Sequence, residues 1–370
     1  MEKASPTMLR DALACYRLPD RVVDCQPYGN GHINDTFLLQ TPAGEASADY
    51  ILQRINTDIF RRPDQLMANI TAVTEHLAAR IRGRGGDPAR ETLTVIPTAK
   101  GEAYAVTPDG CWRLYLFVAG SVTHEAAEHP AQLESAGRTF GAFMMDLADF
   151  PAATLHETIP LFHHTPDRLR QFHEAVAEDA KGRRGMVKAE IEGVLAFAGE
   201  ASYLTDQLAA GRLPLRVTHN DTKLNNILFD AKTDRGLCVI DLDTVMPGLL
   251  AYDFGDAIRV GANRTGEGDP DVSHVGVSME RFTAFAKGLL GALGDTLTDD
   301  EAASLVMGAK LMTWEVASRF LADYLRGDTY FKIHYPTQNL DRARNQLVLV
   351  RDIHRRQAEL EDVIQALRAR

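Results

Sequence analysis

The sequence has few cysteines and no long apolar run. Its four cysteines form no C-x-x-C pair and no zinc-type spacing, so neither a disulfide framework nor a zinc site is expected. No run of about 18 apolar residues occurs, so no membrane-spanning helix is predicted. The first residues lack the apolar stretch of a secretory signal peptide. A cytoplasmic location is therefore the default expectation.

An excess of positive charge is also missing. The 370 residues include 40 Lys and Arg against 51 Asp and Glu, which gives a formal net charge of −11. Nucleic acids and anionic membranes are bound through basic patches, so we expect neither as a partner. ATP is not excluded, because Mg2+ and a few local cations can offset its phosphates. The hydrophobic content of 45% is ordinary for a globular protein, and the length suits two lobes.

The hydrophobic pattern changes near residue 117. Before this point we expect helices over 8–16 and 60–82 and strands over 24–28, 35–40, 50–55, 94–97, 103–107 and 112–118. After it, candidate helices cover 131–146, 169–177, 190–209, 279–293, 301–325 and 340–367. The fold class predicted is α+β, with a β-rich, nucleotide-covering lobe over 1–117 and a mostly helical lobe over 118–370.

A polar loop between two apolar strands carries the spacing H-x-D-x4-N. His219, Asp221 and Asn226 supply it. In phosphoryl-transfer enzymes this Asp accepts the proton of the substrate hydroxyl, and the Asn holds Mg2+ near the phosphates. We therefore predict Asp221 as catalytic base and Asn226 as metal ligand. The alternative is an ordinary turn with a buried histidine, since Asp and Asn are common turn residues.

A second apolar strand ends in Asp241-Leu242-Asp243, which can supply another metal ligand. Asp241 lies 15 residues after Asn226, enough for a strand, a turn and a strand. Asp253-Phe254-Gly255 spells the metal-binding tripeptide of protein kinases, but it begins 27 residues after Asn226, too far for that hairpin. We therefore assign the metal to Asn226 and Asp241, and interpret Asp253 and Asp256 as buried carboxylates that hydrogen-bond the loop.

The sequence marks the residues that would contact the nucleotide less clearly. Gly29 and Gly31 lie between the first two expected strands and permit close backbone approach to phosphate, although a hairpin turn explains them equally well. The full G-x-G-x-x-G is absent. His32 lies at the tip and could reach phosphate or substrate. At the end of the β-rich lobe, the backbone of Phe117 and Val118 could pair with adenine.

The third expected strand lacks the lysine that usually pairs with phosphates. Arg54 is its only cation and could bind phosphate oxygens in a bidentate manner, or it could be a solvated surface residue. Glu75, on the helix that follows, is the candidate to orient Arg54. The alternative for Glu75 is an ordinary surface position.

Candidate contacts to the acceptor occur late in the chain. Glu315 and Arg319 are one helical turn apart among apolar neighbours, which suggests partial burial rather than an exposed pair. Tyr330 belongs to segment 328–336, which is rich in side chains that can contact a sugar. Segment 161–166 is a similar but weaker candidate.

These motifs resemble the aminoglycoside phosphotransferase and choline kinase superfamily. The resemblance is carried by 219–226 and 240–248, and the segments 29–36, 52–56 and 252–256 are most similar to its N-acetylhexosamine 1-kinase branch. It extends from about residue 25 to 340. It implies a protein-kinase-like two-lobed fold, ATP as co-substrate, Mg2+, and phosphorylation of the anomeric C1 hydroxyl of GlcNAc or GalNAc. It also implies that Asp221 is the base, that Asn226 and Asp241 are the metal ligands, and that His32 and Arg319 help hold the sugar. Together with Asp221 and Tyr330, they are the predicted substrate contacts.

Other functions fit the same motifs. One is a kinase for another small hydroxyl compound, such as an amino alcohol, homoserine or an aminoglycoside. Another is an inactive nucleotide-binding regulatory module, which has no chemical need for Asp221, Asn226 and Asp241 together. A protein kinase is disfavoured because no Ala-Pro-Glu follows Asp241. The sequence does not identify a protein partner.

Overall fold

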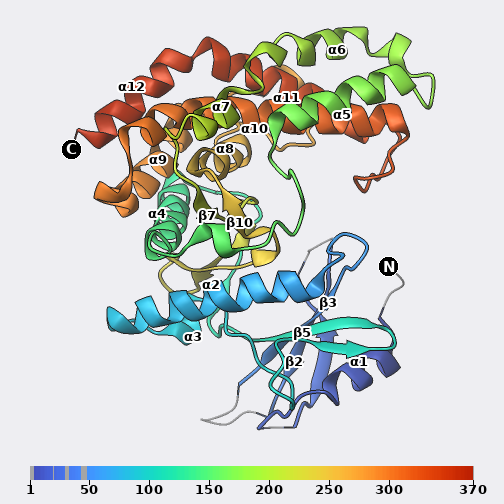
Figure 1. Cartoon of the computed structure of the whole chain (residues 1–370), viewed down its shortest axis with the longest axis vertical. Helices are drawn as coiled ribbons and strands as arrows, with labels where there is room; N and C mark the ends of the chain where they lie inside the picture. Colours follow the sequence, from blue (N-terminus) through green and yellow to red (C-terminus); the bar gives the residue numbers. More distant parts are fainter. Residues whose placement is uncertain (1–3, 20, 30–32, 43–47, 370) are drawn as a thin grey trace. The chain divides into compact units, whose positions relative to one another are not determined.

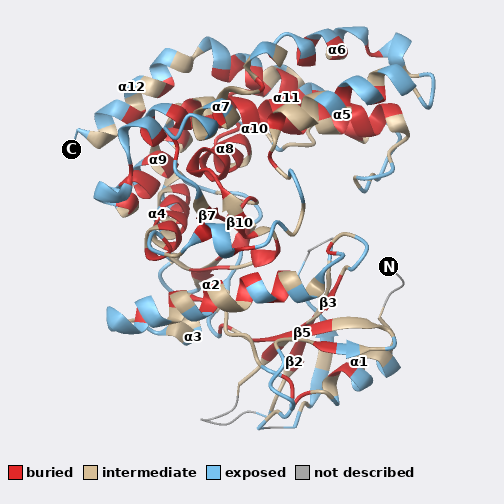
Figure 2. Cartoon of the chain, viewed as in Figure 1, coloured by how far each residue is buried: buried red, intermediate tan, exposed pale blue. Residues whose placement is uncertain are grey.

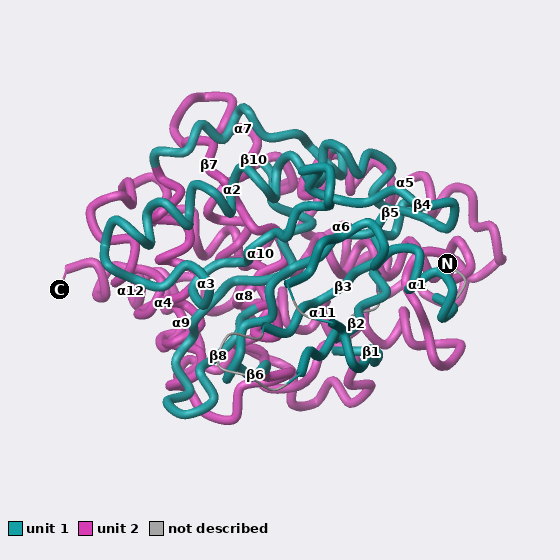
Figure 3. The backbone as a smooth tube through the Cα atoms, turned by 90° about the horizontal axis from the view of Figure 1, so that it is seen from below, with its two compact units in different colours: residues 1–123, 149–160, 227–246 teal, residues 124–148, 161–226, 247–370 magenta. Residues whose placement is uncertain are grey.

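The computed structural model describes residues 4–19, 21–29, 33–42 and 48–369. Its internal contacts divide the chain into two units (Figure 3). Unit 1 comprises residues 1–123, 149–160 and 227–246, and unit 2 comprises residues 124–148, 161–226 and 247–370. The expected lobe boundary between residues 117 and 118 stays a prediction.

An antiparallel sheet with the order β1-β2-β3-β5-β4 forms the centre of unit 1 (Figure 1). Its strands are β1 (Asp24–Pro27), β2 (Asp35–Gln40), β3 (Tyr50–Ile55), β4 (Ala105–Thr107) and β5 (Gly110–Leu116). Apolar side chains of the sheet pack against the short helix α1 (Pro6–Leu13) in one buried cluster. Of the expected strand 94–97, only Val95 forms a bridge, to Tyr115.

A long helix and a second small sheet complete unit 1. The helices are α2 (Pro63–Gly83) and the short α3 (Pro88–Glu91). The stripe Leu66, Ile70, Val73 and Leu77 is buried as its periodicity predicts. The second sheet has the order β6-β8-β9, with β6 (Ser121–Val122), β8 (Ile227–Asp230) and β9 (Gly236–Val239).

Unit 2 is mainly helical. Its helices are α4 (Pro130–Asp146), α5 (Thr165–Glu178), α6 (Lys188–Leu195), α7 (Tyr203–Ala209), α8 (Leu250–Gly261), α9 (Met279–Leu293), α10 (Asp299–Arg326), α11 (Gln338–Arg355) and α12 (Gln357–Arg368). Strand β7 (Arg216–Thr218) pairs with β10 (Met246–Gly248). Figure 2 shows α8 and α10 buried along most of their length. Helices buried on all sides form the core of a domain, and these two pack against each other.

Short 3-10 turns connect several of these elements: η1 (Ala152–Thr154), η2 (Arg184–Met186), η3 (Ala198–Glu200), η4 (Leu224–Asn226), η5 (Leu242–Thr244), η6 (Val272–His274) and η7 (Gly294–Thr296). Within the part of the chain that the structure describes, no helix is both long and apolar enough to cross a membrane.

Two helix predictions for unit 2 were wrong, and one helix of unit 2 was missed. The expected helix over 190–209 is two helices, α6 and α7, because a 3-10 turn around Gly199 interrupts it. The expected helix over 340–367 likewise breaks at Arg356 into α11 and α12. Helix α8 was not predicted at all, although its charged residues Asp253, Asp256 and Arg259 recur every three positions, as they do along one side of a helix.

Candidate active site

The polar loop after β7 is a tightly held turn of unit 2. Asn220 has a left-handed backbone, with φ of 63°, which non-glycine residues rarely adopt. The His219 ring is fully buried against the edges of Phe140 and Phe143, and its Nδ1 accepts the N–H of Asp221 at 3.2 Å. His219 therefore shapes the loop from inside the core.

Asp253, in the first turn of α8, holds this loop through hydrogen bonds to its backbone. Its carboxylate oxygens accept the backbone N–H groups of His219 at 2.8 Å and Asn220 at 2.7 Å, and its own carbonyl accepts the Thr222 hydroxyl at 2.5 Å. Burial raises the pKa of Asp253 to about 6, although charge from His219 and the two N–H donors oppose this rise. The prediction that Asp253 is a structural carboxylate of this loop is confirmed.

Asn226 is positioned by Asp221. Its amide nitrogen Nδ2 donates to the backbone carbonyl of Asp221 at 2.7 Å and to Asp221 Oδ2 at 3.0 Å. Both N–H groups of the amide thus point to Asp221, so the oxygen Oδ1 faces the other way. A neutral oxygen presented in this way suits a hard divalent cation such as Mg2+.

Lys223 adds a cation that the sequence reasoning missed. Its ammonium lies 2.5 Å from Asp221 Oδ1. Burial acts to lower the pKa of Lys223, but the carboxylates of Asp221 and Asp256 raise it above the ordinary value, so the side chain is charged. The sequence does contain a signal for this residue, because Lys223 follows the predicted base Asp221 by two positions. Asp256 is buried and paired with Arg259 at 2.6 Å.

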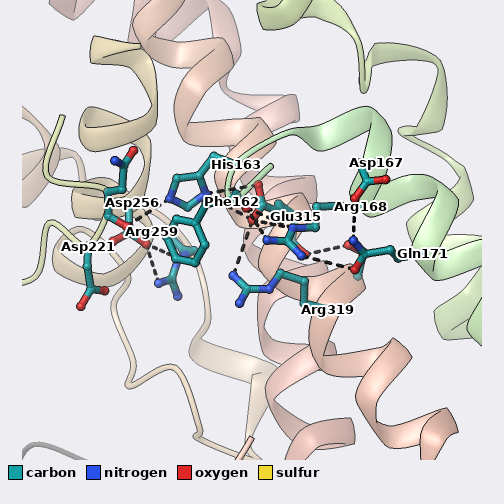
Figure 4. Close-up of polar contacts among 12 residues, drawn as sticks. Phe162, His163, Asp167, Arg168, Gln171, Asp221, Asp256, Arg259, Glu315 and Arg319 are labelled. Atoms are coloured by element: carbon teal, nitrogen blue, oxygen red, sulfur yellow. Dashed lines mark hydrogen bonds and ion pairs between the residues drawn. The ribbon is translucent and has the colours of Figure 1, made fainter. Parts of the chain in front are cut away.

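A cluster of charges around Glu315 lies beside this loop in unit 2 (Figure 4). The Glu315 carboxylate is fully buried and has three cationic or titratable neighbours: His163 Nδ1 at 3.2 Å, Arg319 Nη1 at 3.5 Å and Arg168 Nε at 3.7 Å. Burial alone would raise the pKa of Glu315, but His163 and the two arginines lower it. The expected partial burial of the Glu315–Arg319 pair is confirmed.

Aromatic rings surround the outer arginine of this cluster. The Arg319 guanidinium carbon lies 5.6 Å from the ring centre of Phe162, 5.7 Å from that of Tyr330 and 5.5 Å from that of Phe331. Tyr330 is 62% exposed. The structure thus brings together Arg319, Tyr330 and the weaker candidate segment 161–166.

The segment after β9 belongs to unit 1 and holds two carboxylates of different character. Asp241 is exposed, with a left-handed backbone at φ of 59°. Asp243 is buried; it forms an ion pair with Arg113 and accepts Asn34 Nδ2 at 2.7 Å. Of these two carboxylates, Asp241 is therefore the accessible one, and its role as a metal ligand stays a prediction.

Arg113, on β5, is a second cation that sequence reasoning missed. It is 1% exposed, pairs with Asp243 and donates from Nε to Gln53 Oε1 at 2.9 Å. Burial opposes its charge, but Asp243 and its other neighbours raise the pKa of Arg113 further above its already high value. The signal was a lone arginine inside an apolar strand.

Arg54 lies on the opposite face of β3 from Gln53. It is buried, donates from Nε to Asp35 Oδ2 at 2.9 Å and contacts the sulfur of Met8 in α1 at 3.7 Å. The expectation that Glu75 orients Arg54 was wrong, because Asp35 does so across the β2–β3 register and Glu75 is exposed. A phosphate-binding role for Arg54 stays a prediction.

The expected nucleotide contacts are only partly within the described residues. Gly31 and His32 lie outside them. Gly29 has φ of 74°, which favours glycine, and the ring of the adjacent Tyr28 meets Phe117 edge-on at 5.9 Å. The Phe117 N–H donates to the Asp49 carbonyl, and the Val118 carbonyl accepts the Ser121 hydroxyl. Adenine pairing at Phe117 and Val118 stays a prediction.

Comparison with known folds agrees with this architecture. The microcompartment-associated aminopropanol kinase matches at 18% identity with a TM-score of 0.64, over 96% of this chain and 99% of that one. A spectinomycin phosphotransferase solved with ADP and spectinomycin matches at 10% identity and 0.56, over 99% of each chain. Choline kinase from Cryptosporidium parvum Iowa II matches at 11% and 0.56, over 93% of this chain and 91% of that one.

These likenesses confirm the predicted fold class: a protein-kinase-like fold with a sheet-rich N-terminal region and a helical C-terminal region. A family model described as the phosphotransferase enzyme family matches residues 24–275, which is more than half of the chain. The matched stretch contains the loop of Asp221, the segment of Asp241 and the carboxylate Asp253. The chain belongs to the phosphotransferase enzyme family.

Proposed function

We propose that the protein is an ATP- and Mg2+-dependent kinase that phosphorylates the anomeric C1 hydroxyl of N-acetylhexosamines such as GlcNAc and GalNAc. The observation that carries the kinase part is the loop of Asp221, whose carboxylate contacts Lys223 and Asn226 and whose backbone N–H is held by His219. The ADP in the related spectinomycin phosphotransferase structure supports a nucleotide co-substrate.

In this reaction Asp221 accepts the proton of the sugar C1 hydroxyl. The hydroxyl oxygen forms a bond to the γ-phosphorus of ATP, and the bond between the γ-phosphorus and the oxygen that leaves with ADP breaks. Asn226, through Oδ1, and Asp241 are the proposed metal ligands, a small protein donor set of the kind that Mg2+ takes beside phosphates. When bound, Mg2+ compensates phosphate charge. Lys223 stabilises negative charge on the transferred group, because its ammonium lies beside Asp221.

The charge around Glu315 supports the proposed acceptor class. One carboxylate faces the two guanidinium groups of Arg168 and Arg319 and the His163 imidazole, which leaves an excess of positive charge. This environment repels cationic acceptors such as amino alcohols and aminoglycosides. A neutral sugar with an acetamide carbonyl can accept hydrogen bonds from Arg319 and pack on the Tyr330 ring. We propose His32 as a further sugar contact.

An assay with a panel of acceptors tests this proposal. Protein, Mg-ATP and separate sugars, amino alcohols, homoserine or aminoglycosides are incubated, and phosphorus NMR identifies the product. We expect a sugar 1-phosphate from GlcNAc or GalNAc. A sugar 6-phosphate, or a phosphorylated amino alcohol as the main product, contradicts the assignment.

The same assay tests the base. Asp221→Asn removes the proton acceptor and should lower kcat roughly 100- to 10,000-fold, while Mg-ATP still binds. Asp295→Asn is the matched control, since Asp295 is an exposed carboxylate of unit 2. Full turnover by Asp221→Asn excludes the proposed role of Asp221.

A further inference from the structure

The peptide group that joins Asn220 to Asp221 is held at both ends by histidines. Its carbonyl lies 3.1 Å from His163 Nε2, and its N–H donates to His219 Nδ1 at 3.2 Å. Asp221 extends from this peptide by a side chain with two torsions. The plane of the peptide therefore sets the position from which the carboxylate of the base extends, while Lys223 and Asn226 contact the carboxylate itself.

His163 comes from a distant part of the chain, just before α5, and is buried. Its Nδ1 lies 3.2 Å and 3.3 Å from the two carboxylate oxygens of Glu315. An ionised carboxylate and a backbone carbonyl can only accept hydrogen bonds, so both ring nitrogens must carry hydrogen for both contacts to form. His163 in this geometry is an imidazolium.

The surroundings support a charged ring. Burial works to lower the pKa of His163, but the charge and hydrogen bond of Glu315 on α10, together with Asp256 on α8, raise it above the ordinary value. The rings of Phe162 and Tyr252 contact the imidazole and exclude water from it.

The left-handed backbone of Asn220 shows why such an anchor is needed. A non-glycine residue with φ of 63° is held against its own preference and persists only where its surroundings enforce it. Asp253 fixes the N–H side of Asn220, whereas His163 fixes its carbonyl side.

We propose that His163 is a positioning residue for the catalytic base: its imidazolium, anchored on Glu315, holds the Asn220 carbonyl and so aims Asp221. This inference rests on the proposed role of Asp221. Glu315 also contacts Arg319, the proposed sugar ligand, so one buried carboxylate supports both the base and the acceptor contact.

Steady-state kinetics with Mg-ATP and GlcNAc test the inference. His163→Gln cannot donate to both partners as the imidazolium does, so kcat should fall roughly 10- to 100-fold with KM for ATP and GlcNAc nearly unchanged. His354→Gln is the control, because the His354 ring also bonds a charged partner, Lys310, within unit 2. An unchanged kcat in His163→Gln, or an equal fall in both variants, overturns the proposal.

Side-chain NMR of protein with 15N-labelled histidine gives a readout that needs no turnover. At pH 7 both nitrogens of His163, assigned by their loss in His163→Gln, should be protonated. In Glu315→Gln the ring should become neutral, with one proton. A neutral His163 in the wild type refutes the positioning role even if GlcNAc 1-phosphate forms. Conversely, a protonated His163 with no sugar product leaves the anchor in place and contradicts the proposed function.

Discussion

Asp253 resembles a catalytic carboxylate in sequence but serves the loop as a fixed acceptor. Both oxygens receive backbone N–H groups, from His219 and Asn220. By analogy with the Asp-Phe-Gly tripeptide of protein kinases, Asp253 would be assigned as a metal ligand. Its side chain is 1% exposed and its hydrogen bonds go to the backbone, so it shapes the site without contacting the reacting atoms.

Replacing Asp253 should impair turnover without removing any substrate contact. In Asp253→Asn one acceptor oxygen becomes an NH2 group that faces a backbone N–H, so the loop must shift. We expect kcat to fall about 100-fold, the loss that a misplacement of about 1 Å can cause. Asp323→Asn is not a suitable control, since Asp323 caps several backbone N–H groups itself. Asp295→Asn, at an exposed position, should retain full kcat; an equal kcat in Asp253→Asn and Asp295→Asn contradicts the role.

The raised pKa of Asp253 predicts that the stability of the protein depends on pH, and that Asp253→Asn weakens this dependence. The folded pKa of about 6 exceeds the ordinary value of 3.8, so the folded state holds the proton more tightly than the unfolded state does. The stabilisation is therefore present below about pH 4 and is lost as the pH rises through about 6. Denaturant unfolding at pH 4.5 and 7 should show this loss in the wild type and a smaller change in Asp253→Asn.

At the scale of elements, several predicted bounds agree with the structure. Strands β2 and β3 and helix α9 have the predicted bounds, and the apolar positions of β3 and α9 recur with the period of a strand and of a helix. Helix α8 escaped prediction; its buried residues include the charged Asp253, Asp256 and Arg259, and charged side chains normally indicate exposed surface rather than a buried helix. The element that carries Asp253 was therefore missing from the predicted fold, although Asp253 itself was interpreted correctly.

Two glycines let α8 and α10 approach closely. A Cβ added at Gly255 would lie 2.3 Å from the carbonyl oxygen of Gly308, and one added at Gly308 would lie 2.2 Å from that of Ala251. Backbone atoms cannot move aside as a flexible side chain can, so any side chain here separates the helices.

Gly308→Ala should therefore destabilise the protein by roughly 1–3 kcal/mol, the usual cost of overpacking, and reduce kcat because α8 carries Asp253. Gly291→Ala is the matched control: Gly291 lies in α9 with nothing within 4 Å of the added Cβ. That change should stabilise the helix by about 0.5–1 kcal/mol. Urea unfolding of both variants measures the difference, and a Gly308→Ala variant as stable as Gly291→Ala is inconsistent with close packing.

For the molecule as a whole, sequence spacing identified site residues that are close to one another in the sequence. It missed contacts between residues that are far apart in the sequence. Asp221 and Asn226 share one loop, and Asp241 follows the next hairpin. Arg113 meets Gln53 from 60 positions away, and His163 meets Asn220 from 57. Such partners depend on strand register and helix packing, which no short motif records.

Binding of Mg-ADP should stabilise the whole protein through linkage. At about 100 times its Kd, a ligand that binds only the folded state adds about 2.7 kcal/mol. We expect this gain in thermal unfolding of the wild type, its loss when EDTA removes Mg2+, and its loss in Asp241→Ala.

Glu102→Ala is the control for this experiment, because Glu102 is an exposed acid of unit 1. It should show the full gain. An undiminished gain in Asp241→Ala contradicts the proposed metal-ligand role of Asp241.

The division into units also determines when unit 1 can finish folding during synthesis on the ribosome. Unit 1 is assembled from three separate stretches, the last of which ends at Met246. The ribosome adds about 5–20 residues per second, so several seconds pass between the emergence of residue 123 and that of Met246. During that interval unit 1 lacks the β8–β9 hairpin, and Arg113 lacks its ion-pair partner Asp243. The nascent chain therefore exposes an incomplete unit 1 until Met246 has been made, and this is the period in which chaperones would be most needed.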